Sequence, residues 1–302
     1  MKTKEANVSI SLDMKGIPIN NYGVIQCVEI GEQRSIVAIA EKGLDYWNRL
    51  NPNITPVLLS YSWDLGRDLR TTKGLETKVT LNEGLINCAE WLINNVTEYK
   101  DFSVWKYSYP SYFGTKSGWR SAHAQGQAIQ LLLRVFEITK NSDMLNCAYA
   151  AIYGFSKSLE QGGLAEFLDS EQTWYHKFAD ENSEHPKVLN GMLFAILGLI
   201  DFQKRIGMSE VNDMLSRGLN GLVFNLSKYD HGKWSSYIDN NKLASAHYHS
   251  LHCQQLSAIN EYINFPIIKE TLSRWQLSNV KNAIGGKYSP SIIQAILHYF
   301  TK

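Results

Sequence analysis

The sequence predicts an all-α protein in which antiparallel helix pairs build an α/α barrel, or toroid. Most segments with a clear pattern repeat their apolar residues at spacings of three and four, which is typical of helices. Some segments are apolar around most of the helix circumference and others on one face only, as expected for inner and outer layers of helices. Short turns join several of the helices and favour antiparallel neighbours. A simple helical bundle is the alternative.

The helical pattern is strong in six segments and weaker in three. The strong segments are 35–50, 81–96, 124–139, 142–159, 187–206 and 209–229, and the weaker ones are 248–262, 266–275 and 289–301. Residues 124–139 are apolar nearly all round and predict an inner helix. Ser142 suits an N-cap, and Pro186 predicts the start of the next strong helix.

Two long aromatic stretches interrupt the helices, at 102–119 and 164–178. Long ordered loops in compact domains usually carry function, so we expect these loops to form a cleft. Nothing in the sequence resembles an interdomain linker or a repeat, and 302 residues suit one large domain spanning 1–302.

Charge and targeting signals argue against a nucleic-acid-binding, secreted or membrane-spanning protein. The chain has 30 Lys and Arg against 29 Asp and Glu, so it lacks an overall basic character for nucleic acid or an anionic membrane. The N-terminus has no apolar signal region, and the longest apolar run, 191–200, is too short to span a bilayer. The four cysteines form no CxxC pair. We expect a soluble, cytoplasmic protein with buried free thiols and no transmembrane segment.

Three segments gather polar and aromatic side chains. SGWRSAHAQGQA (117–128) places polar groups at a helix start, where free N–H groups favour an anion. KYDHGKWSSYID (228–239) predicts a tight turn and a short extended piece that ends near Tyr237. On their residues alone, a capped helix with Gln on a solvated face and a hairpin loop with one buried tyrosine are the better explanations of these two segments.

The third segment, ASAHYHSLHCQQL (244–256), holds three of the eight histidines: His247, His249 and His252. His249 and His252 are one helical turn apart and would share a face. Imidazoles at this spacing can bind a metal, act as acids and bases, or pack as ordinary polar groups. Because no Asp or Glu follows before Glu261 and no HExxH pattern occurs, we predict neither a metal site nor a cofactor.

Together these segments resemble the C-terminal domain of the D-glucuronyl C5-epimerases. The matching pieces are SGWRSAHAQGQAIQLLLRVFEIT, WYHKF with HPKVLNGMLFAILGLIDF, LSKYDHGKWSSYID and SAHYHSLHCQQLSAI, in the family's order. The resemblance covers about residues 16–276 and implies an α/α barrel. It also implies proton transfer at C5 of a uronic acid residue in a poly- or oligosaccharide.

The resemblance also implies site residues. Tyr237 and Tyr248 fall on two of the family's three functional tyrosines, and His249 and His252 on the histidines beside them, so we expect these four to be catalytic. The expected substrate contacts are Trp119, Arg120, His123, Gln125, Gln127, Tyr175, Lys177, Asn190, Asp230 and Asn240. Epimerisation needs a base that removes the C5 proton, an acid that returns one on the opposite face, and stabilisation of the charge on the carboxylate.

The chain departs from the family's pattern at the third tyrosine. Phe178 stands in its place, with Lys177 replacing the glutamate beside it, and phenylalanine cannot transfer a proton. Asn240 replaces an arginine of the animal enzymes, and His123 occupies a position that is apolar in the family.

Three functions therefore stay open. The first is a C5-epimerase in which His123, His176 or Lys177 supplies the missing group. The second is a polysaccharide lyase that uses the same C5 carbanion, and the third is a non-catalytic uronate-binding protein. A glycoside hydrolase is weaker because no convincing carboxylate pair is visible. We rank the epimerase first. Its partner would be a uronic acid-containing saccharide rather than nucleic acid, and the sequence leaves a homodimer open.

Overall fold

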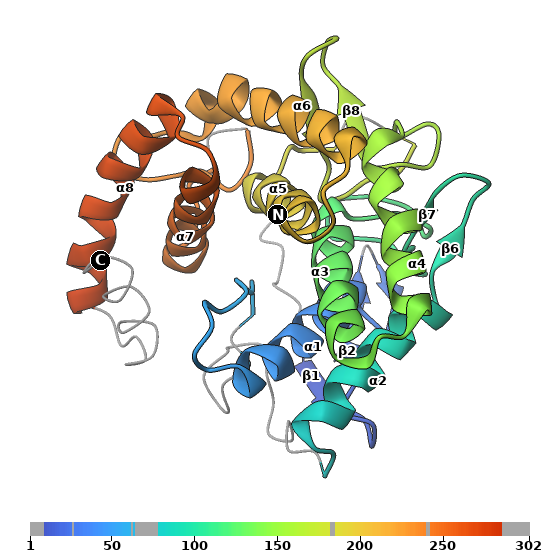
Figure 1. The fold of residues 1–302 in the computed structure, drawn as a ribbon. Coiled ribbons are helices and arrows are strands. Elements are labelled where there is room, and N and C mark those ends of the chain that lie inside the picture. The colour runs from blue at the N-terminus through green and yellow to red at the C-terminus, as the bar shows by residue number, and fades with distance from the viewer. Residues whose placement is uncertain are drawn as a thin grey trace.

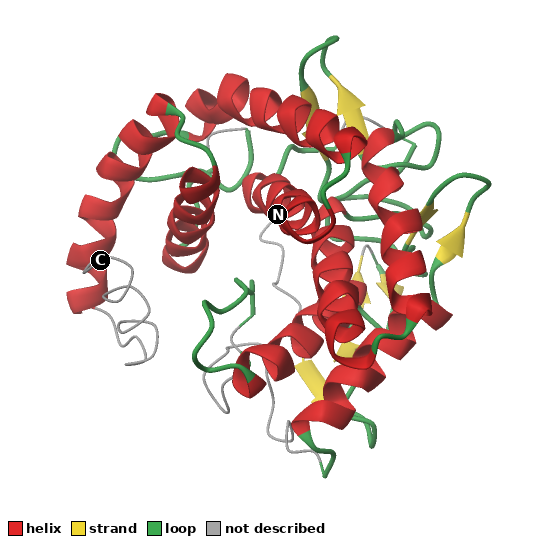
Figure 2. Ribbon diagram, viewed as in Figure 1, coloured by secondary structure: helices red, strands yellow, loops and turns green. Residues whose placement is uncertain are grey.

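In the described part of the chain, eight α-helices alternate between an inner and an outer layer (Figures 1 and 2). The computed structural model describes residues 9–25, 27–61, 63, 78–181, 185–239 and 242–285, with side chains up to Trp275. The inner helices are α1 (Ile36–Leu50), α3 (Ala122–Thr139), α5 (Leu189–Ile206) and α7 (Ala246–Tyr262), and the outer ones are α2 (Leu81–Asn94), α4 (Ser142–Ile152), α6 (Ser209–Asn225) and α8 (Pro266–Gly285).

Each inner helix packs against the outer helix that follows it and against the next inner helix. The described helices form an arc from α1 at the lower side of Figure 1 through α4 and α6 to α8. The paired, two-layer arrangement agrees with the prediction, but the described residues show an open arc and no closed barrel. One polar contact links the two ends of the arc: Nε2 of His247, in the first turn of α7, lies 3.0 Å from the carbonyl oxygen of Ser60, which follows α1.

Short antiparallel hairpins correct the all-α prediction. β1 (Ser9–Leu12), β2 (Pro18–Asn21) and β5 (Glu32–Gln33) form one sheet in the order β1-β2-β5. The other pairs are β3 (Val24–Ile25) with β4 (Val28–Glu29), β6 (Thr97–Glu98) with β7 (Ser103–Val104), and β8 (Ala165–Phe167) with β9 (Thr173–Tyr175). Strands of two to four residues are too short to give a readable alternation of apolar and polar residues.

Several helix boundaries also differ from the prediction. Ser142 is the first helical residue of α4, because the side chain of Asn141 accepts the hydrogen bond from Asp143 N and acts as the N-cap. Helix α4 ends at Ile152, where the 3₁₀ helix η1 (Tyr153–Ser156) begins, and η2 (Leu226–Tyr229) likewise ends α6 early. Pro186 lies in the loop before α5, which starts at Leu189, and the predicted helix at 289–301 lies outside the described residues.

The close approach of α3 to α5 depends on two glycines. A Cβ atom added at Gly198 would lie 2.5 Å from the Cα of Gly126, well inside van der Waals contact. At the other end of the same interface, Arg134 forms an ion pair with Asp201 at 2.6 Å. The two inner helices are therefore packed backbone to backbone where these glycines meet, and α3 is an inner helix as predicted.

The four cysteines are free thiols, but only Cys88 and Cys253 are buried. Cys147 is half-buried and Cys27 is exposed, so the expectation of buried thiols holds for two of the four. Among the described helices, none has the length and apolar character that crossing a membrane requires.

Candidate active site

The loops that precede the inner helices meet at the N-terminal ends of those helices. Ala122 N, at the start of α3, donates to the carbonyl oxygen of His176 at 2.9 Å. Leu189 N, at the start of α5, donates to the carbonyl oxygen of Tyr237 at 3.1 Å. These backbone bonds bring residues 176–178 and 235–238 beside the first turn of α7, so side chains far apart in the sequence become neighbours.

Lys177 lies at the centre of the side chains gathered there. Its ammonium group donates to Asn190 Oδ1 and to the hydroxyl oxygen of Tyr237, each at 3.2 Å. The same nitrogen lies 5.5 Å from the ring centroid of Tyr237 and 5.8 Å from that of Tyr248, within cation–π range. The two tyrosine rings are 4.5 Å apart and tilted by 53°. We call Lys177, Asn190, Tyr237 and Tyr248 the Lys177 cluster.

An aromatic wall borders the Lys177 cluster. Phe178 packs against Phe113 at 4.6 Å and against Trp119 at 5.4 Å between ring centroids, and Phe113 reaches Tyr237 at 6.4 Å. Trp119 is buried, stacks on Tyr107 at 3.9 Å, and donates its indole N–H to the carbonyl oxygen of Tyr109. Phe178, where the resemblance predicts the third tyrosine, therefore lies next to the cluster but offers it only an apolar surface.

Two fully buried histidines lie behind the cluster and share one hydroxyl group. Ser235 N lies 3.1 Å from His249 Nδ1, and a backbone N–H can only donate, so this ring nitrogen accepts. The His249 proton is then on Nε2, which faces the carbonyl oxygen of Trp275 at 3.4 Å. Ser235 Oγ lies 2.8 Å from His252 Nδ1. Because the Nδ1 lone pair of His249 is already used, the hydroxyl hydrogen is best directed to His252, which places the proton of His252 on Nε2.

Burial keeps both imidazoles neutral. It lowers the pKa of His249 to about 4, against the opposing effect of the Trp275 carbonyl, and it lowers the pKa of His252 well below its usual value, helped by His249 and by the charge of Lys177. Neutral imidazoles at this depth suit hydrogen bonding and orientation. Both rings contact the Ser235 hydroxyl, and the described residues contain no cluster of three or more His, Cys, Asp or Glu that could hold a metal ion.

Three buried polar atoms around the cluster have no hydrogen-bond partner in the described part of the chain: His252 Nε2, Asn190 Nδ2 and Gln255 Oε1. Leaving a buried polar atom unpaired costs roughly 1–3 kcal/mol, so such atoms point to a ligand or an ordered water. Asn190 is held from both sides, since its Oδ1 accepts from Lys177 and its carbonyl oxygen accepts from Gln255 at 3.1 Å. The unpaired amide donor of Asn190 is therefore fixed beside the Lys177 cation.

His123 is paired with a buried carboxylate that the sequence analysis did not single out. Its Nε2 lies 3.1 Å from Glu41 Oε1, and its ring stacks on Phe194 at 4.1 Å. Glu41 also accepts from Ser60 N, Ser60 Oγ and Tyr61 N, at 2.9, 2.7 and 3.0 Å. Burial lowers the pKa of His123 to about 4 despite the hydrogen bond to Glu41, and the charge of Lys177 acts in the same direction as burial. His123 thus holds the segment after α1 against α3.

Several other side chains that the sequence analysis singled out make hydrogen bonds within the fold. The Arg120 guanidinium donates to the carbonyl oxygens of Gly163 and Leu159, and the Gln125 amide donates to those of Ser103 and Ala151. The remaining bonds are Gln127 Nε2 to Leu58 O, Tyr175 Oη to Met214 O, His176 Nε2 with Glu166 Oε2, and Asp230 Oδ1 with Trp275 Nε1. None of these side chains belongs to the Lys177 cluster, and Asn240 lies outside the described residues.

Sequence reasoning missed Glu41, Ser235 and Gln255. Gln255 follows His252 by three residues and so falls on the same face of α7, a spacing that could have identified it. Glu41 interrupts the apolar face of α1 between Ala40 and Leu44, which was a readable signal of a buried carboxylate.

The match to a protein family is consistent with this geometry. The sequence pattern of the family described as D-glucuronyl C5-epimerase C-terminus matches residues 98–277, which include all four members of the Lys177 cluster. The chain belongs to this family. The matched range also contains Phe178, His249 and His252.

Two curated proteins are similar to this chain in sequence. An uncharacterised protein of the archaeon Methanocaldococcus jannaschii is 29% identical over 207 residues, which are 67% of each chain. The D-glucuronyl C5-epimerase of Caenorhabditis elegans is 26% identical over 212 residues, covering 62% of this chain. That match spans only 33% of the nematode enzyme, so the chain corresponds to a third of this relative's length.

Solved structures give a weaker likeness. A D-mannose isomerase superposes with a TM-score of 0.48 at 12% identity, covering 85% of this chain and 64% of the isomerase. A sugar epimerase from a ruminal bacterium superposes with a TM-score of 0.47 at 14% identity, covering 82% of this chain and 60% of the epimerase. Both TM-scores are below 0.5.

Proposed function

We propose that this chain is a uronic acid C5-epimerase acting on a glucuronate-containing poly- or oligosaccharide, and that the Lys177 cluster carries the reaction. Family membership supports a carbohydrate-active enzyme. The observation that carries the finer proposal is the 3.2 Å hydrogen bond from the Lys177 ammonium to the hydroxyl oxygen of Tyr237, with Tyr248 against the same ring.

Lys177 is assigned to the substrate carboxylate. Removing the C5 proton sends the electron pair of the C5–H bond into the adjacent carboxyl group, where negative charge accumulates. A fixed cation beside that group stabilises the transition state more than the ground state. Asn190 adds its unpaired amide donor at the same place, and together the two side chains can hold the carboxylate by two hydrogen bonds.

Tyr237 and Tyr248 are assigned to proton transfer. A phenol becomes a base only when its anionic form is stabilised, and an ammonium that donates to the phenol oxygen provides this for Tyr237. One tyrosine takes the C5 proton, and the other returns a proton to the opposite face of C5. His252 and His249 lie behind them as neutral groups that position the α7 side of the site.

The test is incubation of the purified protein with glucuronate-containing oligosaccharides in heavy water. Deuterium at C5 together with iduronate-type signals in the NMR spectrum is the expected result. Ultraviolet absorbance of unsaturated uronate, with chain cleavage, would instead establish the lyase. Binding without either signal would leave the uronate-binding function and overturn the epimerase.

A further inference from the structure

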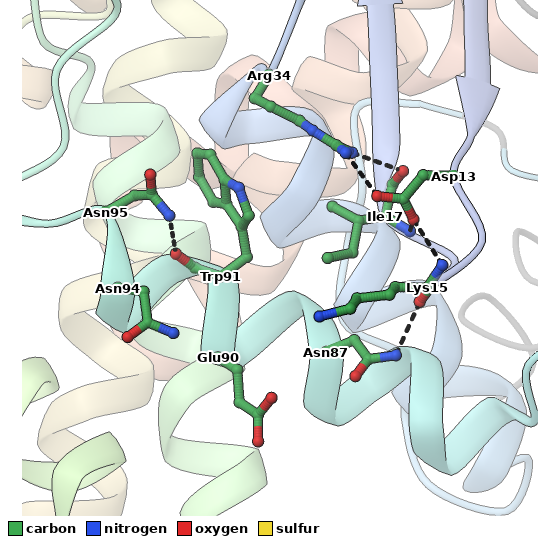
Figure 3. A pocket seen from close by; sticks show the side chains of 9 residues that line it. All are labelled: Asp13, Lys15, Ile17, Arg34, Asn87, Glu90, Trp91, Asn94 and Asn95. Atoms are coloured by element: carbon green, nitrogen blue, oxygen red, sulfur yellow. Dashed lines mark hydrogen bonds and ion pairs between the residues drawn. The ribbon is translucent and has the colours of Figure 1, made fainter.

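A pocket lies on the outside of the arc, and no residue of the Lys177 cluster lines it (Figure 3). It lies between the turn joining β1 to β2 and the outward face of α2, and its volume is about 330 Å³. The side chains that line it come from Asp13, Lys15, Ile17, Arg34, Asn87, Glu90, Trp91, Asn94 and Asn95. A volume near the lower end of the usual range for ligand pockets, about 300–1,000 Å³, suits a small ligand or one unit of a larger one.

Part of the lining is a rigid frame. Asp13 forms an ion pair with Arg34 at 2.5 Å, and its other carboxylate oxygen accepts from Lys15 N and Ile17 N. Asn87 donates its amide to the carbonyl oxygen of Lys15 at 2.9 Å, which fixes the β1–β2 turn to α2. The walls of this pocket are therefore formed before any ligand arrives, and the ordering cost of binding is reduced.

Other side chains of the lining have polar groups that could bind a ligand. Within the described residues, the side chains of Lys15, Glu90 and Asn94 make no hydrogen bond and no ion pair. Lys15 extends along α2 toward Trp91, and the Trp91 ring stands above the helix in Figure 3. Trp91 is half-buried, because one part of its ring packs on the core. The flat ring of Trp91 thus lies beside the hydrogen-bond donor of Lys15, the acceptor of Glu90 and the amide of Asn94, which can both donate and accept.

These groups select the ligand by chemistry. The formal charges of the lining cancel, since Lys15 and Arg34 balance Asp13 and Glu90, so a compact anion such as phosphate gains nothing and is repelled by Glu90. A purely apolar ligand would desolvate three polar side chains without compensation. A polyhydroxylated ring satisfies all of them, because hydroxyls both donate and accept, and its apolar face can pack on the indole.

We propose that this pocket is a second saccharide-binding site, which holds one sugar unit of a polymer whose uronate is processed at the Lys177 cluster. The proposal rests on the proposed function for the identity of the polymer, but the pocket itself is outside the cluster. Two sites on one chain raise the effective concentration of a long polymer at the active site, while an oligosaccharide too short to span both sites gains nothing from the second one.

The first test uses the indole N–H resonance of Trp91 in the full-length protein. It is assigned as the signal missing from the spectrum of Trp91→Phe, a substitution that keeps an aromatic ring on the core. Titration with a short glucuronate-containing oligosaccharide is expected to shift this signal. A resonance that stays fixed up to millimolar saccharide would overturn the proposal, whether or not the protein shows epimerase activity.

The second test separates the pocket from the catalytic cluster. The double variant Lys15→Ala/Asn94→Ala is compared with Asn212→Ala, which removes an exposed asparagine on α6. The pocket variant is expected to bind long polymer at least about tenfold more weakly, with unchanged kcat/KM on a short substrate. Unchanged affinity for the long polymer in the pocket variant would contradict the proposal. If the wild type turns over no substrate, the proposed function fails, but the affinities still decide on the pocket.

Discussion

Lys177 and Tyr237, which are sixty positions apart in the sequence, are joined by a 3.2 Å hydrogen bond from the ammonium group to the phenol oxygen. The bond joins the cation of the Lys177 cluster to a tyrosine that the sequence analysis predicts to be catalytic. In the proposed reaction, Lys177 has two tasks: it stabilises the substrate carboxylate, and it activates the tyrosine that transfers a proton.

Removing the charge of Lys177 should abolish most activity. Lys177→Gln is expected to lower kcat by about 10²-fold or more, the usual effect of losing one preorganised group that stabilises developing charge. Lys177→Arg keeps the charge but changes its geometry and should retain part of the activity. Lys204→Gln, at an exposed lysine of α5, is the control. Equal activity of Lys177→Gln and the control would remove Lys177 from the mechanism.

Tyr248 should be needed for turnover and not for binding. Tyr248→Phe removes only a hydroxyl, so the ring contact with Tyr237 remains, while kcat should fall by roughly 10²–10⁴-fold, as for loss of a general acid or base. Saccharide affinity, measured by calorimetry, should change little. Tyr262→Phe, near the other end of α7, controls for loss of a tyrosine hydroxyl. Full activity of Tyr248→Phe would exclude this tyrosine as acid or base.

Alanine substitutions at two glycines of α5 should have different effects, one on kcat and the other on the free energy of unfolding. A Cβ at Gly191 would lie 2.4 Å from the Cβ of Lys177, so Gly191→Ala should displace the lysine and reduce kcat. A Cβ at Gly198 would instead press on the backbone of Gly126, and Gly198→Ala should lower the free energy of unfolding by roughly 1–3 kcal/mol. Urea denaturation and kinetics on both variants check this. If Gly191→Ala has normal kinetics, the position of Lys177 is not critical.

Stability should decrease in mild acid because His123 is buried in its neutral form. Its pKa is lowered to about 4 in the folded chain against about 6.5 when unfolded, so the unfolded chain binds more protons between these values. The free energy of unfolding therefore rises with pH from about 4 to about 6.5, and this histidine contributes on the order of 3 kcal/mol above that window. His123→Gln should flatten the slope. His231→Gln, at an exposed histidine, should not.

The helices could be predicted from the sequence, but their ends and the short strands could not. Each of the eight described helices buries at least one face, and a buried face produces the regular spacing of apolar residues from which a helix is predicted. The end of α4 depends on local hydrogen bonds, such as the Asn141 cap and the 3₁₀ turn from Tyr153, which compete with the helix over one or two residues. Closure into a barrel is a property of the whole chain, and periodicity within single helices does not determine it.

For the candidate site, the resemblance predicts Tyr237 and Tyr248, and the structure brings their rings together, but the sequence could not show which polar side chains are available for a ligand. Arg120 and Gln125 look like free groups at a helix start. The structure uses both to bind loop carbonyls, because α3 is buried on every side and its polar groups must find partners inside. The pairs Lys177–Tyr237 and Glu41–His123 join distant segments, and only the fold brings them together.

The most direct measurement follows loss of deuterium from C5 of a C5-deuterated glucuronate oligosaccharide in ordinary water. The wild type and Tyr262→Phe should exchange the label and form iduronate. The double variant Tyr237→Phe/Tyr248→Phe should retain the label while still binding the saccharide. Exchange at the wild-type rate in the double variant would contradict the assignment of proton transfer to the Lys177 cluster.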